Sequence, residues 1–145
     1  MDGSACKLWM DQLALQCFFE LRKVKKESIV LLPEKCAHYI KNHVNQEINL
    51  TILTNVLNCS KSKLCALFKK RYATTVMQYI NYQKVKAAKK MLTDCSINVN
   101  EVAYALSFKT PTYFMRVFKK YTDMTPSEYR KTFNETPKKI SKQQS

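Results

Sequence analysis

A similar stretch occurs twice in the chain: SKSKLCALFKK at residues 60–70 and TPTYFMRVFKK at residues 110–120. Tyr79 and Tyr129 each lie eleven residues after the phenylalanine of the Phe-Lys-Lys triplet in their copy. Upstream of each copy, apolar residues with helical spacing are followed by a short turn. A repeat of about 50 residues that contains a helix, a turn and a basic second helix predicts a duplicated helix-turn-helix.

Residues that interrupt helices are rare in this sequence. Glycine occurs once and proline four times among 145 residues, and apolar residues recur three and four positions apart. Ser60, Thr110 and Thr125 have side chains suited to capping helix N-termini, and proline follows each of the two threonines. These features predict an all-α protein. We expect helices over residues 6–22, 34–45, 50–57, 61–71, 75–92, 98–106, 111–121 and 126–132.

Basic charge is concentrated in the middle of the chain. The formal net charge is +14, and the segment from Ile48 to Thr93 has 9 basic residues and no acidic residue. Such a segment favours a polyanionic partner, either nucleic acid or an anionic membrane surface. Double-stranded DNA is the partner we expect, because the basic helices also carry aromatic residues that a packed core needs.

The six cysteines show neither the paired spacing of a zinc site nor the pattern of a disulfide framework. No signal peptide or membrane span is recognisable either. We therefore expect a cytoplasmic, nucleoid-associated protein without metal or cofactor.

The second helix of each unit is expected to enter the major groove, with its apolar face packed inward. Arg116 can bind O6 and N7 of guanine, and Thr112 and Met115 can contact base edges or thymine methyl groups. In the first unit Ser62, Cys65 and Ala66 offer only small side chains, which suits contacts with phosphates and thymine methyl groups and readout of DNA shape at an A·T-rich site. We expect DNA contacts from Lys61, Ser62, Lys63, Cys65, Ala66, Lys69, Lys70, Lys84, Lys109, Thr110, Thr112, Met115, Arg116, Lys119 and Lys120.

One long helix, expected over residues 75–92, connects the two units. Eighteen residues at 1.5 Å each span roughly 27 Å. With the helices that it joins, this length can hold two recognition helices about one turn of DNA, roughly 34 Å, apart. A single chain would then read two successive major-groove segments.

The second unit resembles the signature of the AraC/XylS family of transcription regulators. The resemblance is carried by Glu101-Val102-Ala103-Tyr104, Phe108, the run from Thr112 to Lys120 and the run from Thr125 to Arg130. The run from Ser60 to Lys70, Tyr79 and the run from Lys84 to Leu92 resemble the family's first unit. It covers about residues 37–131. It implies a seven-helix DNA-binding domain and control of transcription at promoters, usually activation through contacts with RNA polymerase.

Three positions depart from the family pattern. The family usually has glycine at the positions of Ser107 and Asp123, and commonly arginine at that of Lys84. A non-glycine residue held at positive φ costs on the order of 1 kcal/mol, with Asp among the least penalised residues. We therefore expect a slightly strained second turn within an intact fold.

The expected organisation has two homeodomain-like helix-turn-helix subdomains joined by the long helix. Residues 34–132 form the DNA-binding domain, with a first unit at 34–74, the linker helix at 75–92 and a second unit at 93–132. Residues 133–145 are expected to be a disordered basic tail. Residues 1–33 form an amphipathic segment that is either a remnant of a sensor or dimerisation domain or a helix that docks on the same core. We expect a monomer, or a weak dimer formed through residues 6–22.

Two other functions are compatible with parts of this pattern. A sequence-neutral nucleic-acid or chromatin-architectural binder would need only the basic middle segment. An enzyme would need a reactive centre, but His38 and His43 are five residues apart and so lie off one helical face, and no cysteine has a recognisable base beside it. We therefore expect a transcription regulator that is not an enzyme.

Overall fold

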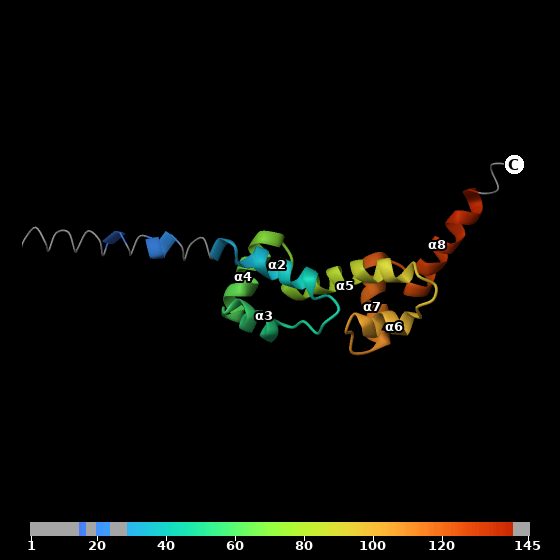
Figure 1. Cartoon of the computed structure of the whole chain (residues 1–145), viewed down its shortest axis with the longest axis horizontal. Coiled ribbons are helices and arrows are strands. Elements are labelled where there is room, and N and C mark those ends of the chain that lie inside the picture. Colours follow the sequence, from blue (N-terminus) through green and yellow to red (C-terminus); the bar gives the residue numbers. More distant parts are fainter. Residues whose placement is uncertain (1–14, 17–19, 24–28, 141–145) are drawn as a thin grey trace, which may run out of the picture.

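The computed structural model describes residues 15–16, 20–23 and 29–140, and it contains helices and no strand in these ranges. The expected all-α fold is confirmed, and Figure 1 shows two groups of helices joined by one long helix. The helices are α2 (Leu32–Asn42), α3 (Leu50–Leu57), α4 (Lys61–Tyr72), α5 (Val76–Leu92), α6 (Val99–Ala105), α7 (Pro111–Thr122) and α8 (Pro126–Ile140). Most of the helix expected over residues 6–22 lies outside the described residues.

The last helix is longer than expected. We predicted an end near residue 132 and a disordered tail from 133, but α8 continues to Ile140, so this prediction is wrong for residues 133–140. The first two of the added residues make contacts. The ring of Phe133 packs 5.1 Å from that of Tyr129, and the Cys95 thiol donates to the side-chain oxygen of Asn134 at 3.3 Å.

The protein has two hydrophobic cores, and α5 contributes to both. Its first half supplies Val76 and Ile80 to a core formed with α2, α3 and α4. Its second half supplies Val85, Ala88 and Leu92 to a core formed with α6, α7 and α8. The linker helix is therefore also a structural element of each unit, which fixes how the units are attached to it.

The internal repeat is visible in the packing of aromatic rings. Phe68 and Tyr79 meet edge to face, with ring centroids 5.2 Å apart and an interplanar angle of 74°. Phe118 and Tyr129 repeat this contact at 5.5 Å and 73°. The eleven-residue interval seen in the sequence thus produces the same contact in both units.

The expected helix caps are present. The Ser60 hydroxyl accepts from the amide of Lys63 at 3.3 Å, and the Thr110 hydroxyl accepts from that of Tyr113 at 3.2 Å. Thr125 and Glu128 cap each other's backbone amides. These bonds fix the start of each recognition helix and of α8.

The backbone adopts positive φ at the turns of both units. Ser107 and Asp123 have φ values of 54° and 60°, as expected from the glycines that the family has there. In the first unit Asn58 and Ala73 take the matching positions, with φ values of 49° and 55°. The repeat therefore preserves backbone geometry even where no glycine is present.

Candidate nucleic-acid interface

The two recognition helices, α4 and α7, each have one buried face. In α4 the side chains of Leu64 and Phe68 are fully buried. In α7 those of Phe114 and Phe118 are fully buried, and Val117 is nearly so. These residues anchor each helix to its core, so the opposite face is fixed in direction.

Nearly all the residues predicted to contact DNA lie on the outer surface. On and around α7 every one of them is exposed, and on α4 only Cys65 is half-buried. The exposed set comprises Lys61, Ser62, Lys63, Ala66, Lys69, Lys70, Lys109, Thr110, Thr112, Met115, Arg116, Lys119 and Lys120. Contact of these residues with DNA stays a prediction.

Lys84 is the exception, and its predicted role in DNA contact is wrong. Its side chain is only 5% exposed, and its ammonium donates to the backbone oxygens of Leu106 at 2.7 Å and Gln46 at 3.3 Å. Burial lowers the pKa of this amine from its ordinary value. A phosphate cannot reach an amine that is enclosed and already bonded in this way.

The sequence did contain a signal for this burial. Ile80, Lys84, Ala88 and Leu92 follow one another at intervals of four along α5, and all four are buried. Residues at this spacing share one helix face. A lysine at such an apolar position has to find partners within the protein.

Arg116 lies beside an aromatic residue that the sequence reasoning did not select. Its guanidinium carbon is 5.8 Å from the ring centroid of Tyr113, whose side chain is 41% exposed. A cation near an aromatic face is attracted by the ring quadrupole. Tyr113 can therefore orient the arginine that we expect to read a base.

Thr110 caps α7 and remains able to contact a ligand. Its hydroxyl oxygen accepts the amide of Tyr113, which leaves the hydroxyl hydrogen free to donate. A phosphate oxygen at this helix start would also benefit from the positive end of the helix dipole.

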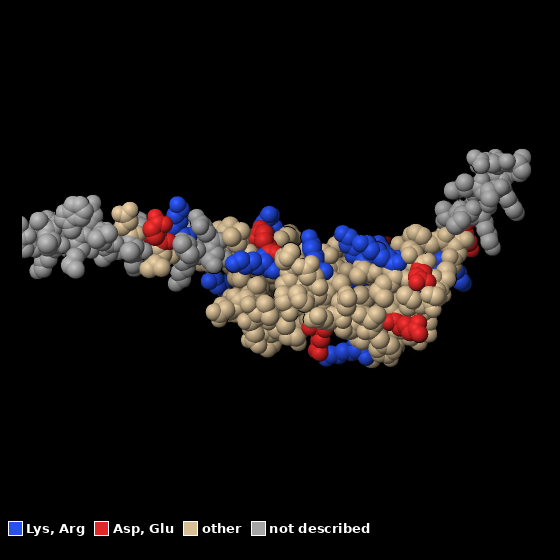
Figure 2. Space-filling model, viewed as in Figure 1, with Lys and Arg blue, Asp and Glu red and all other residues tan. Residues whose placement is uncertain are grey.

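The cations at the ends of the recognition helices are not all equivalent. Figure 2 shows Lys and Arg side chains along the upper edge of the molecule, above α4 and α5. Arg71 in the last turn of α4 is bound to Glu34 of α2, with 2.6 Å between the nitrogen and the oxygen. The Arg71 hydrogen bond lowers the pKa of the Glu34 carboxyl. Lys69 and Lys70 are exposed in the same turn and make no ion pair within 4.0 Å in the described part of the chain.

Of the described cysteines, only Cys36 is buried. Burial raises the pKa of the Cys36 thiol to about 12, which keeps it protonated and weakly nucleophilic. Within residues 15–16, 20–23 and 29–140, no three His, Cys, Asp or Glu side chains are grouped so that they could hold a metal ion. Over the same ranges, no helix has both the length and the apolar character needed to cross a bilayer.

Comparison with known families identifies this arrangement. The family model described as "Helix-turn-helix domain" matches residues 53–142, which is more than half of the chain. The chain belongs to this AraC-type helix-turn-helix family. The resemblance seen in the sequence is thereby confirmed. The match contains the whole second unit and overlaps the second half of the first unit.

Curated relatives agree with this assignment. The chain is 32% identical over 93 residues to the xylose operon regulatory protein of Escherichia coli, an alignment that covers 64% of this chain and 24% of that protein. It is 34% identical over 96 residues to an uncharacterized HTH-type transcriptional regulator of Pseudoalteromonas carrageenovora, covering 66% and 57% respectively. The chain thus spans about a quarter of the length of the xylose regulator that it matches.

A solved structure shows the same fold in a DNA-binding protein. The DNA-binding domain of AdpA, a global transcriptional factor solved in complex with a target DNA, superposes with a TM-score of 0.67. The match covers 72% of this chain and 94% of that one, at 18% sequence identity. At this identity the similarity establishes the fold of this AraC-type domain.

Proposed function

We propose that this AraC-type domain binds promoter DNA sequence-specifically and reads two successive major-groove segments. One observation carries the proposal: α4 and α7 are built on repeated cores, and each presents an exposed basic face. The connecting helix α5 has 17 residues and is therefore roughly 26 Å long. That length suits two reading helices about one turn of DNA apart.

The two recognition helices would have different tasks. On α7, Arg116 can bind a guanine through two hydrogen bonds, and Thr112 and Met115 can meet neighbouring bases. On α4, Ser62 and Ala66 are small and reach few base atoms. We infer that α7 supplies most of the direct base readout, while α4 relies on phosphates and on the shape of an A·T-rich segment.

Transcription activation through RNA polymerase is part of the same proposal and rests on the family resemblance alone. The expected pairing of two copies through residues 6–22 also stays a proposal, because most of that segment lies outside the described residues. The nucleoid location follows only if the domain binds DNA in the cell.

The proposal is tested by selecting bound duplexes from a random pool and titrating the selected sequence against scrambled DNA at two salt concentrations. We expect two conserved blocks about ten base pairs apart, bound on the order of a thousandfold more tightly than scrambled DNA. Binding without any enriched sequence, governed only by salt, would instead show the sequence-neutral binder that the basic surface alone also permits.

A further inference from the structure

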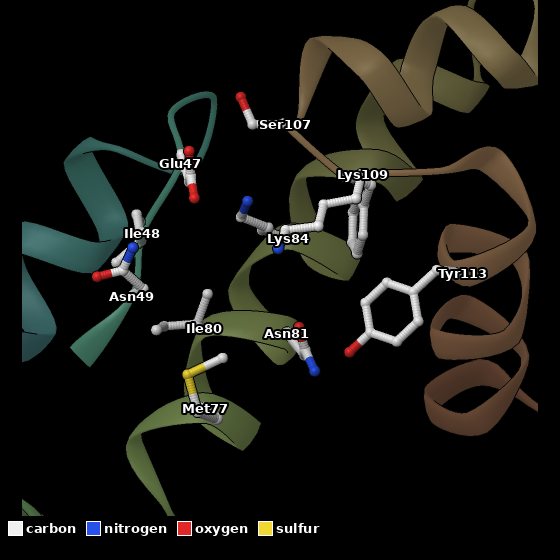
Figure 3. Close-up of a pocket in the computed structure, with 11 residues that line it drawn as sticks. Glu47, Ile48, Asn49, Met77, Ile80, Asn81, Lys84, Ser107, Lys109 and Tyr113 are labelled. Atoms are coloured by element: carbon white, nitrogen blue, oxygen red, sulfur yellow. The ribbon is translucent and has the colours of Figure 1, made fainter. Parts of the chain in front are cut away.

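One of the places where the two units meet lies beside the linker helix, between the segment before α3 and the turn after α6. There a groove of about 660 Å³ opens between the segment before α3, the middle of α5 and the turn before α7. Figure 3 shows Lys84 extending from α5 between the segment carrying Glu47 and Asn49 and the turn carrying Ser107. The residues of this junction come from both units, so their contacts fix the position of one unit against the other.

Lys84 makes a bond to each unit from the helix between them. Its ammonium donates to the oxygen of Leu106, the C-cap of α6 in the second unit, at 2.7 Å. It also donates to the oxygen of Gln46, in the loop between α2 and α3 of the first unit, at 3.3 Å. The ring of Phe108 lies beside the amine, with its centroid 5.3 Å away.

These contacts resist relative movement of the units because the charge is buried. A buried ammonium that loses an acceptor keeps its desolvation cost without compensation. Any rotation that separated Gln46 from Leu106 would therefore leave part of the charge of Lys84 unsatisfied.

Ser107 ties the same two segments a second time. Its hydroxyl donates to the backbone oxygen of Asn45 at 2.7 Å, across 62 residues of sequence. Asn45 precedes Gln46, and Ser107 follows Leu106, so the two bonds lie next to each other. Ser107 is also one of the residues with positive φ. This backbone conformation sets the direction in which its side chain leaves the turn.

We propose that Lys84 is a positioning residue that sets the distance and rotation between the two recognition helices, and thereby the spacing of the two DNA blocks that the protein accepts. This inference rests on the proposed bipartite reading of DNA. One inserted base pair moves the second block by about 3.4 Å and rotates it by about 35°. A protein with rigidly placed units can then keep only one recognition helix on its DNA block. A protein whose units can move relative to each other can still bind both blocks.

The test compares three duplexes: the selected site, and the same site with one or two base pairs inserted between its blocks. For the wild-type chain we expect each insertion to weaken binding about tenfold or more, because the second unit no longer binds as a tethered partner. For Lys84→Met we expect the penalty to fall to about twofold, with unchanged affinity for a duplex that carries a single block. An unchanged spacing penalty in Lys84→Met would overturn the proposal.

Two variants separate positioning from other effects. Lys84→Arg keeps a buried donor and should restore the wild-type spacing penalty. Lys86→Met removes an exposed lysine two residues further along α5 and should leave that penalty unchanged. If Lys86→Met relaxed spacing as much as Lys84→Met, the buried bonds would not be the cause.

Ser107→Gly keeps the proposal testable even if Lys84→Met does not fold. It removes the bond to Asn45 and relieves the positive-φ strain, so we expect a stable protein with a reduced spacing penalty. If Ser107→Gly were stable but kept the full loss of affinity on base-pair insertion, and Lys84→Met folded poorly, the junction would only stabilise the fold. The proposal that it positions the two units would then be refuted. If the wild-type chain itself preferred no two-block site, the proposed function would fail and not only this inference.

Discussion

Arg116 differs from the lysines around it in what it can recognise. Its planar guanidinium can form two parallel hydrogen bonds with a guanine, and its guanidinium carbon lies 5.8 Å from the ring centroid of Tyr113. We expect Arg116→Ala to reduce discrimination at one base pair by about 1–3 kcal/mol. Titration of the selected site and its single-base variants measures this change. Equal losses on the selected site and on scrambled DNA would exclude base readout by Arg116.

Lys69 should contribute to binding of every sequence alike. It is exposed in the last turn of α4, where it can neutralise a phosphate and release a counterion. We expect Lys69→Ala to lower the slope of log affinity against log salt by about one, on selected and scrambled DNA alike.

The neighbouring cation Arg71 provides a matched control for Lys69. Its guanidinium is bound to Glu34, so Arg71→Ala should change the salt slope much less. A larger slope change for Arg71→Ala than for Lys69→Ala would show that the ion pair opens when DNA binds.

At the level of the helices, the ends of α4 and α7 allow a direct measurement of backbone strain. Ala73 and Asp123 follow these helices with φ values of 55° and 60°. We expect Ala73→Gly to raise the free energy of unfolding by about 0.5–1 kcal/mol, because glycine has no Cβ to clash at positive φ. Asp123→Gly should gain less, since aspartate tolerates this conformation better than alanine.

Denaturant titration of both glycine variants measures these gains, with the slope of the transition as a check that the unfolded state is unchanged. A loss of stability in Ala73→Gly would mean that the strain at this helix end is smaller than the entropy that glycine costs.

The sequence was sufficient to predict the elements whose signals are local. Ser60 and Thr110 mark helix starts through their own side chains, and the Phe–Tyr interval revealed the repeat because the two residues are only eleven positions apart. The burial of Lys84 had a local signal in its spacing along α5, but its two acceptors lie 22 and 38 residues away and could not be predicted. The extent of α8 was missed as well, and the contact of Asn134 with Cys95, 39 residues away, gave no local signal.

For the whole molecule, the sharing of α5 determines how the two units unfold. Each half of α5 completes a different core, and Lys84 and Ser107 tie the units together beside it. Loss of one unit would expose half of α5 and break the junction. We therefore expect the wild-type chain to unfold in one cooperative transition, with equal calorimetric and van't Hoff enthalpies.

Weakening one core should separate the two units. Phe118 is fully buried in the second core, and its replacement by alanine removes about 3–5 kcal/mol of stability there. We expect Phe118→Ala to unfold in two steps, with the second unit lost first and the first unit, centred on Phe68, persisting to higher temperature. Phe68→Ala should reverse this order, because the two phenylalanines occupy equivalent positions. Two transitions already in the wild-type chain would show that the junction does not couple the units, and that α5 behaves as a simple tether.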